Sequence, residues 1–121
     1  MPSQVIGNGG GIGGVVISSL FNAETLTYTD DTNYVAGPLS YVPKAIAEVN
    51  VFVIDGVTQD YGVDYTVRSV SGGTAPGYYV CVAIASTAPG GGAFVGGANP
   101  SAGIETILAS GDKLRVIYPS S

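Results

Sequence analysis

The chain has 121 residues, a length that fits one domain, and 45% of them are hydrophobic, which excludes intrinsic disorder. Four Lys or Arg and nine Asp or Glu give a net charge of −5, with no His, so we expect no nucleic-acid partner and no membrane partner, because phosphates are bound by clustered cations. Only 11% of the residues are charged, where soluble domains average about 25%, so neighbouring subunits are expected to cover part of the surface.

Glycine dominates the first fourteen residues, and residues 1–14 are therefore predicted to form a flexible arm ahead of a single β domain, residues 15–121. The arm contains three apolar residues, Val5, Ile6 and Ile12. Either the arm stays disordered or these residues dock on a partner. The N-terminal sequence lacks the basic region and apolar core of a secretory signal, so we expect synthesis in the cytoplasm without export by the general route.

From residue 15 onward, β-branched and aromatic residues separated by turn residues predict strands. The first two are expected at residues 15–21 and 24–29, the second with apolar and threonine residues in alternation. Residues 37–44 contain two prolines, which cannot donate to a strand ladder, and are predicted to be irregular. Residues 45–47 are a candidate start for a short helix.

Residues 49–54 are the strongest predicted strand, and the Asp-Gly pair at 55–56 predicts a hairpin turn after it. Residues 64–70 alternate again, and the nearly continuous apolar run at 78–85 predicts a central strand buried on both faces. Residues 112–118 are the last predicted strand. With seven or eight short strands and no long amphipathic helix, the chain is predicted to be all-β, either a small β-sandwich or a jelly-roll-like barrel.

Residues 86–103 form a predicted glycine-rich loop, far longer than a usual β connection. Phe94 and Val95 are its one large apolar pair. They are expected either to anchor the loop on the domain or to insert into a neighbouring subunit. Together with the arm residues Val5, Ile6 and Ile12, they are the predicted assembly contacts.

No motif in the chain predicts enzyme chemistry or a bound cofactor. Gly9, Gly11 and Gly14 match GxGxxG, but a strand is predicted after them, where a dinucleotide site needs a helix. Without His, the usual base for a nucleophile is missing, and zinc is disfavoured as well. Cys81 lies between two valines and is predicted to fill the core, and as the one cysteine it has no intrachain disulfide partner.

The acidic residues allow two further interpretations. Asp60 and Asp64 are a candidate carboxylate pair for glycoside hydrolysis, but solvated turn residues are the simpler interpretation. Asp30, Asp31 and Asn33 carry oxygen ligands for calcium without the spacing of a known loop, and a turn is again favoured. No metal is therefore expected. The strand tyrosines are predicted to pack in the core or on sheet faces: Tyr65, Tyr79 and Tyr118.

Three segments resemble a β module of tailed-bacteriophage virion proteins: VFVIDGVTQ at 51–59, GVDYTV at 62–67 and SGDKLRVIY at 110–118. They contain 24 of the 121 residues, about a fifth of the chain. The module occurs in head fibres, tail fibres and capsid decoration proteins. This chain departs from it by the inserted strand at 78–85 and the glycine-rich loop, and it lacks the repetitive shaft of a fibre.

The resemblance is closest to a small decoration, or cement, protein. It implies a homotrimer on the capsid surface of the virion, made in the bacterial host cytoplasm, whose partner is the major capsid protein. The alternative is a tail, neck or fibre component that binds a host receptor or other virion proteins. A small enzyme, such as a glycan hydrolase acting through Asp60 and Asp64, and a monomer with a surface rich in Ser, Thr, Gly and Asn are the other interpretations left open.

Overall fold

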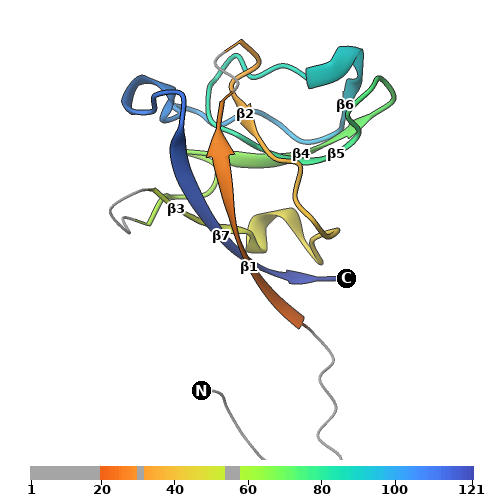
Figure 1. The fold of residues 1–121 in the computed structure, drawn as a ribbon, viewed down its shortest axis with the longest axis vertical. Coiled ribbons are helices and arrows are strands. Elements are labelled where there is room, and N and C mark those ends of the chain that lie inside the picture. The colour runs from red at the N-terminus through yellow and green to blue at the C-terminus, as the bar shows by residue number, and fades with distance from the viewer. Residues whose placement is uncertain (1–19, 30–31, 54–57) are drawn as a thin grey trace, which may run out of the picture.

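The computed structural model describes residues 20–29, 32–53 and 58–121. Within these residues the chain is all-β, and seven strands form two antiparallel sheets that pack as a small β-sandwich (Figure 1). The fold class predicted from the sequence is therefore confirmed. The strands are β1 (Leu20–Tyr28), β2 (Val35–Ala36), β3 (Asn50–Phe52), β4 (Thr66–Ser71), β5 (Gly77–Cys81), β6 (Ala93–Val95) and β7 (Asp112–Ser120).

One sheet has the strand order β1-β7-β3 and the other β2-β5-β4-β6. Alternation along the strands turns one side chain in two toward the space between the sheets, and these residues form the main core. Val51, Leu114 and Val116 from the first sheet and Val67 and Val80 from the second are fully buried there. The described residues contain no helix long and apolar enough to cross a membrane.

β1 is one continuous strand, not the two that the sequence predicts at 15–21 and 24–29. Asn22 and Ala23 were expected to separate them, but they pair with Tyr118 and Ile117 of β7, so pairing over the whole strand outweighs their weak strand propensity. Residues 15–19 lie outside the described residues. At the other end of the chain, β7 runs past the predicted limit to Ser120 and includes Pro119.

β5 is a central strand whose residues are buried on both faces from Tyr79 to Cys81, as predicted, but it ends four residues earlier than the apolar run. The cause is a turn closed by Ser86, whose hydroxyl accepts from the Ala83 amide at 3.0 Å and lies 3.0 Å from the Ala83 carbonyl oxygen. Ile84 in this turn is largely exposed.

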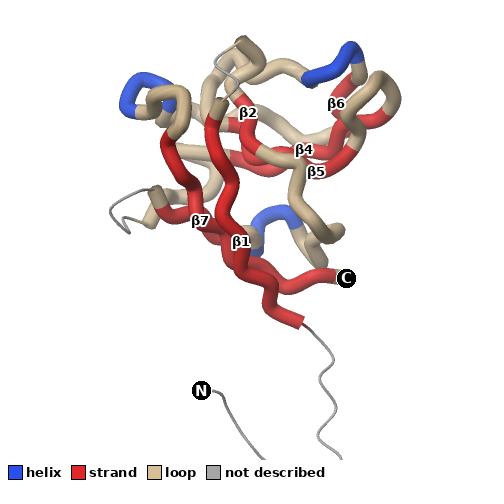
Figure 2. Tube along the Cα trace, in the orientation of Figure 1, coloured by secondary structure: helices blue, strands red, loops and turns tan. Residues whose placement is uncertain are grey.

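The remaining predictions concern short elements. Val51 and Phe52 pair with Gln59 and Thr58, so the two limbs of the predicted hairpin are antiparallel neighbours. A two-residue Asp-Gly turn would pair Phe52 with Gln59 instead, so the register differs by one residue, and the turn at 54–57 lies outside the described residues. The predicted helix start at 45–47 is a single 3-10 turn, η1 (Ile46–Glu48). Figure 2 shows this turn and two similar ones, η2 (Pro89–Gly91) and η3 (Glu105–Ile107), in the connections between strands.

Candidate interaction site

The glycine-rich segment 86–103 is not the strandless loop predicted from the sequence, because it contains β6. β6 pairs with β4, placing Phe94 opposite Val70 and Val95 opposite Ser69. Consecutive residues of a strand point to opposite faces, so Phe94 and Val95 have different surroundings. Phe94 lies on the outer face of its sheet, in a second apolar cluster with Val70 and Cys81.

Phe94 is held in this cluster by Arg68. The guanidinium carbon of Arg68 lies 4.2 Å from the centre of the Phe94 ring, a cation–π contact. The Nε and Nη2 of Arg68 both donate to the Gly96 carbonyl oxygen, at 3.1 and 2.9 Å, and Nη1 donates to Asn99 Oδ1 at 3.1 Å. Of the two roles expected for Phe94, anchoring the segment on its own domain is the one that its half-buried position fits.

Further side-chain bonds and close glycine packing fix the rest of segment 86–103. Asn99 Nδ2 donates to the carbonyl oxygens of Ile84 and Ser86, at 3.1 and 3.0 Å. Gly73 has a φ of 67°, and a Cβ on it would lie 2.5 Å from the Gly90 carbonyl oxygen. Glycine is therefore required there for both conformation and space. The segment is a structured part of the domain.

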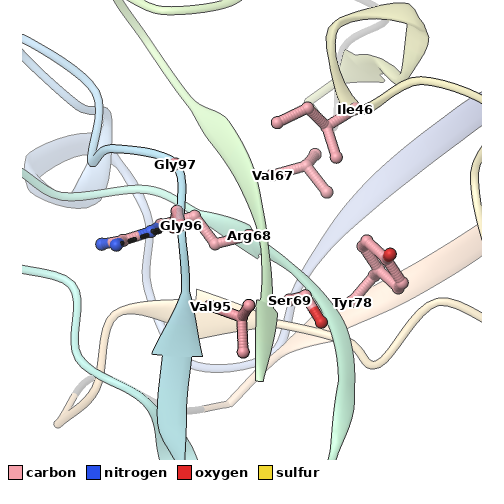
Figure 3. A pocket seen from close by; sticks show the side chains of 8 residues that line it. All are labelled: Ile46, Val67, Arg68, Ser69, Tyr78, Val95, Gly96 and Gly97. Carbon is pink, nitrogen blue, oxygen red and sulfur yellow. Dashed lines mark hydrogen bonds between the residues drawn. The ribbon is translucent and has the colours of Figure 1, made fainter. Parts of the chain in front are cut away.

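Val95 is 60% exposed and points to the inner face of the sheet, at the rim of an open cleft of about 230 Å³ (Figure 3). The side chains of Ile46 and Val67 contribute its apolar wall, while the Arg68 guanidinium turns away toward Gly96. Ile46 comes from η1, so the cleft lies where the connection before β3 meets the β6 edge of the other sheet. Its lining is Ile46, Val67, Arg68, Ser69, Tyr78, Val95, Gly96 and Gly97.

Exposed apolar side chains also lie on both sides of the end of β7, and they were not predicted as a site. Phe21 is 73% exposed and faces Pro119 across the β1–β7 pair. On the other side of β7, the Ser121 amide donates to the Val42 carbonyl oxygen at 2.9 Å. Phe21, Val42 and the adjacent exposed Tyr41 thus flank the end of β7, and we call these three residues the end patch.

Asp60 and Asp64, the two carboxylates considered for catalysis, form hydrogen bonds that close a turn. Asp64 Oδ2 accepts from the Asp60 amide at 2.9 Å, and the Asp64 amide donates to the Asp60 carbonyl oxygen at 2.9 Å, so the two close a turn. Asn33 Nδ2 donates to Thr87 Oγ1 at 2.8 Å, while Asp30 and Asp31 lie outside the described residues. In the described part of the chain no group of His, Cys, Asp or Glu is arranged to hold a metal ion.

The cysteine and the strand tyrosines are buried, as the sequence predicts for them. Cys81, Tyr65, Tyr79 and Tyr118 are all in the core. Burial raises the pKa of the Cys81 thiol to about 11, so at neutral pH it is a protonated side chain without nucleophilic character. Burial likewise raises the pKa of Tyr65 to about 12, and the Tyr65 hydroxyl donates to the Val49 carbonyl oxygen.

The predicted arm contacts Val5, Ile6 and Ile12, and the three glycines of the GxGxxG match, lie outside the described residues. No protein-family model matches the chain, and no curated protein or solved structure matches it either.

Proposed function

We propose that the protein is a structural, non-enzymatic component of a tailed-bacteriophage virion that binds the outside of the assembled capsid and stabilises contacts between major capsid subunits. The observation that carries the proposal is the apolar character of the exposed surface. Among the described residues, seven large hydrophobic side chains are about half exposed or more: Phe21, Tyr41, Val42, Val63, Ile84, Val95 and Ile107. Such side chains, on a chain with 11% charged residues, favour a surface that other subunits cover.

The end patch is the surface that fits capsid docking best. It has two exposed aromatic side chains and a valine on the two sides of the end of β7. Aromatic residues in the centre of an interface often contribute much of its binding energy. The resemblance of residues 51–59, 62–67 and 110–118 to phage virion modules supports the same role. A protein that binds only the assembled capsid raises its stability by mass action.

The test is to add purified protein to capsids, from the same phage, that were assembled without it. Saturable, stoichiometric binding and a higher capsid melting temperature are expected. Phe21→Ser should weaken binding by about tenfold or more, because the side chain is a large part of the exposed apolar area. Ile107→Ser is the matched control, since Ile107 is 66% exposed but lies in η3, outside the end patch.

Two results would overturn the proposal. One is the absence of capsid binding at every salt concentration tried. The other is location of the labelled protein at the tail, neck or fibres of intact particles by electron microscopy, which would assign the alternative virion role.

A further inference from the structure

The cleft at Val95 is too small for most small-molecule ligands and large enough for a side chain. Pockets for drug-sized ligands have volumes of about 300–1,000 Å³, whereas a dry cavity of about 150 Å³ is enough for benzene. The cleft, at about 230 Å³, lies between these values. Its size therefore fits one or two aliphatic side chains of a peptide.

The chemistry of the cleft selects an apolar and uncharged occupant. Ile46, Val67 and Val95 present hydrocarbon to it. The one charged group of the lining, the Arg68 guanidinium, is already bonded to Gly96 and Asn99. A charged side chain entering the cleft would lose water without gaining an ionic partner, which costs free energy.

The backbone beside the cleft suits an extended peptide. β6 is the edge strand of its sheet and, among the described strands, pairs with β4 alone. Gly96 and Gly97 follow it and carry no side chain that would keep a second backbone away. Peptides commonly bind by adding to such an edge, with alternate side chains entering adjacent pockets.

The chain itself contains a segment with these properties. Residues 1–19 include no Asp, Glu, Lys or Arg, and Val5 and Ile6 are adjacent large aliphatic residues between polar and glycine residues. Thirteen residues lie between Ile6 and Leu20, where β1 begins, and the fourteen residue-to-residue steps between those two span about 46 Å in an extended chain. A domain of about 100 residues is about 33 Å across, estimated from a radius of gyration of about 13 Å. The segment is therefore long enough to reach the cleft.

We propose that the cleft lined by Ile46, Val67 and Val95 is the docking site for the N-terminal segment of this chain, with the Ile6 side chain inserted in it and Val5 next to Val95 at its rim. The inference goes beyond the proposed function and does not depend on it, because it concerns the protein in solution without capsids. If the segment comes from a neighbouring copy, the same contact links copies head to tail, and a ring forms where the rotation from one copy to the next closes.

The test is disulfide trapping in the full-length chain. Val5→Cys combined with Val95→Cys is oxidised under mild conditions, and its rate is compared with that of Val5→Cys combined with Thr106→Cys. Thr106 is exposed in η3, outside the cleft, and native Cys81 is buried and does not compete. Far-UV circular dichroism checks that each variant folds, and folding is expected because Val95 and Thr106 are both exposed.

We expect the cleft pair to form its disulfide at least about tenfold faster than the control pair, because docking raises the effective concentration of the two thiols. Adding Ile6→Asn should reduce the rate to that of the control. The mass of the product tells whether the docked segment belongs to the same copy or to a neighbour, and either product supports docking. Equal rates for the two pairs, or a rate unaffected by Ile6→Asn, would overturn the proposal.

Discussion

Tyr118 connects the end of β7 to the segment that follows β2. Its hydroxyl donates to Glu24 Oε2 at 2.5 Å and accepts from the Tyr41 amide at 3.2 Å, and Ser40 Oγ donates to Glu24 Oε1 at 2.9 Å. Burial and the hydrogen bond to Glu24 raise the pKa of Tyr118 from 10.0 to about 12. The neutral phenol is thus part of the contact that holds residues 40–41, next to the end patch.

This pKa predicts a loss of stability in alkaline solution. A group whose pKa is raised by folding stabilises the fold below its unfolded pKa, and that contribution disappears as the pH rises through its folded value. The window runs from about pH 9 to about pH 12, because the pKa of Cys81 rises from 9.0 to about 11 and that of Tyr118 to about 12. The free energy of unfolding, measured by urea denaturation, should fall over this range.

Tyr118→Phe isolates the contribution of this phenol. The variant should lose about 1–3 kcal/mol of the free energy of unfolding at pH 7, because the partly buried Glu24 Oε2 loses its hydrogen bond from the phenol. Its free energy of unfolding should also fall less steeply between pH 10 and 12 than that of the unmodified chain. Ser40→Ala removes a neighbouring hydrogen bond to Glu24 without removing a titrating group. The free energy of unfolding of this variant should therefore fall between pH 10 and 12 as steeply as that of the unmodified chain. Identical alkaline profiles for Tyr118→Phe and the unmodified chain would contradict this assignment.

At the scale of elements, the strands with clear alternation were predictable, and β2 and β6 were not. β7 and β4 lie close to their predicted limits because apolar and polar residues alternate along both sequences. In β7 this alternation separates core from solvent, whereas β4 is an internal strand with buried residues on both of its faces. β2 has two residues and β6 has three, so neither is long enough to show a period. Both strands form because they pair with strands that are distant in the sequence, and a local sequence pattern does not predict such pairing.

The same reasoning explains which site residues were predicted. Phe94 and Val95 were predicted as contacts because a large apolar pair is unusual among glycines. The end patch was missed, although a signal for it was present. Phe21, Thr25 and Thr27 are all odd-numbered residues of one strand, so they lie on the same face, and the two threonines face solvent. Treating residues 15–21 as a separate strand removed that signal. The cleft needs η1 and β6 side by side, and that proximity follows only from the tertiary fold.

Arg68 gives a prediction about segment 86–103. Arg68→Lys keeps the charge but loses the planar fork that binds Gly96 and Asn99 and the stacking on Phe94. We expect a loss of about 1 kcal/mol in the free energy of unfolding and faster hydrogen exchange at the amides of residues 93–99. Arg115→Lys, on an exposed position of β7, is the control and should change neither. Unchanged exchange in Arg68→Lys would show that the segment is held by other contacts.

For the whole molecule, the balance between charge and apolar surface determines how copies interact. Each copy carries a net charge of −5, so copies repel one another at low ionic strength. The exposed apolar side chains act in the opposite direction, because their burial between copies is favourable and does not weaken when salt screens charges. Association of this protein should therefore depend on salt in a direction opposite to that of an ionic interface.

Sedimentation measurements on the purified chain test this expectation. We expect a trimer at low micromolar concentration in 0.15 M salt, a level at which the Debye length is about 8 Å, and dissociation when the salt is lowered about tenfold and the repulsion reaches about 25–30 Å. Higher salt should tighten association further, since the net charges are screened while apolar burial remains. A chain that stays monomeric at high concentration, or a trimer that salt dissociates, would mean that its few charges, and not its apolar surface, govern contacts between copies.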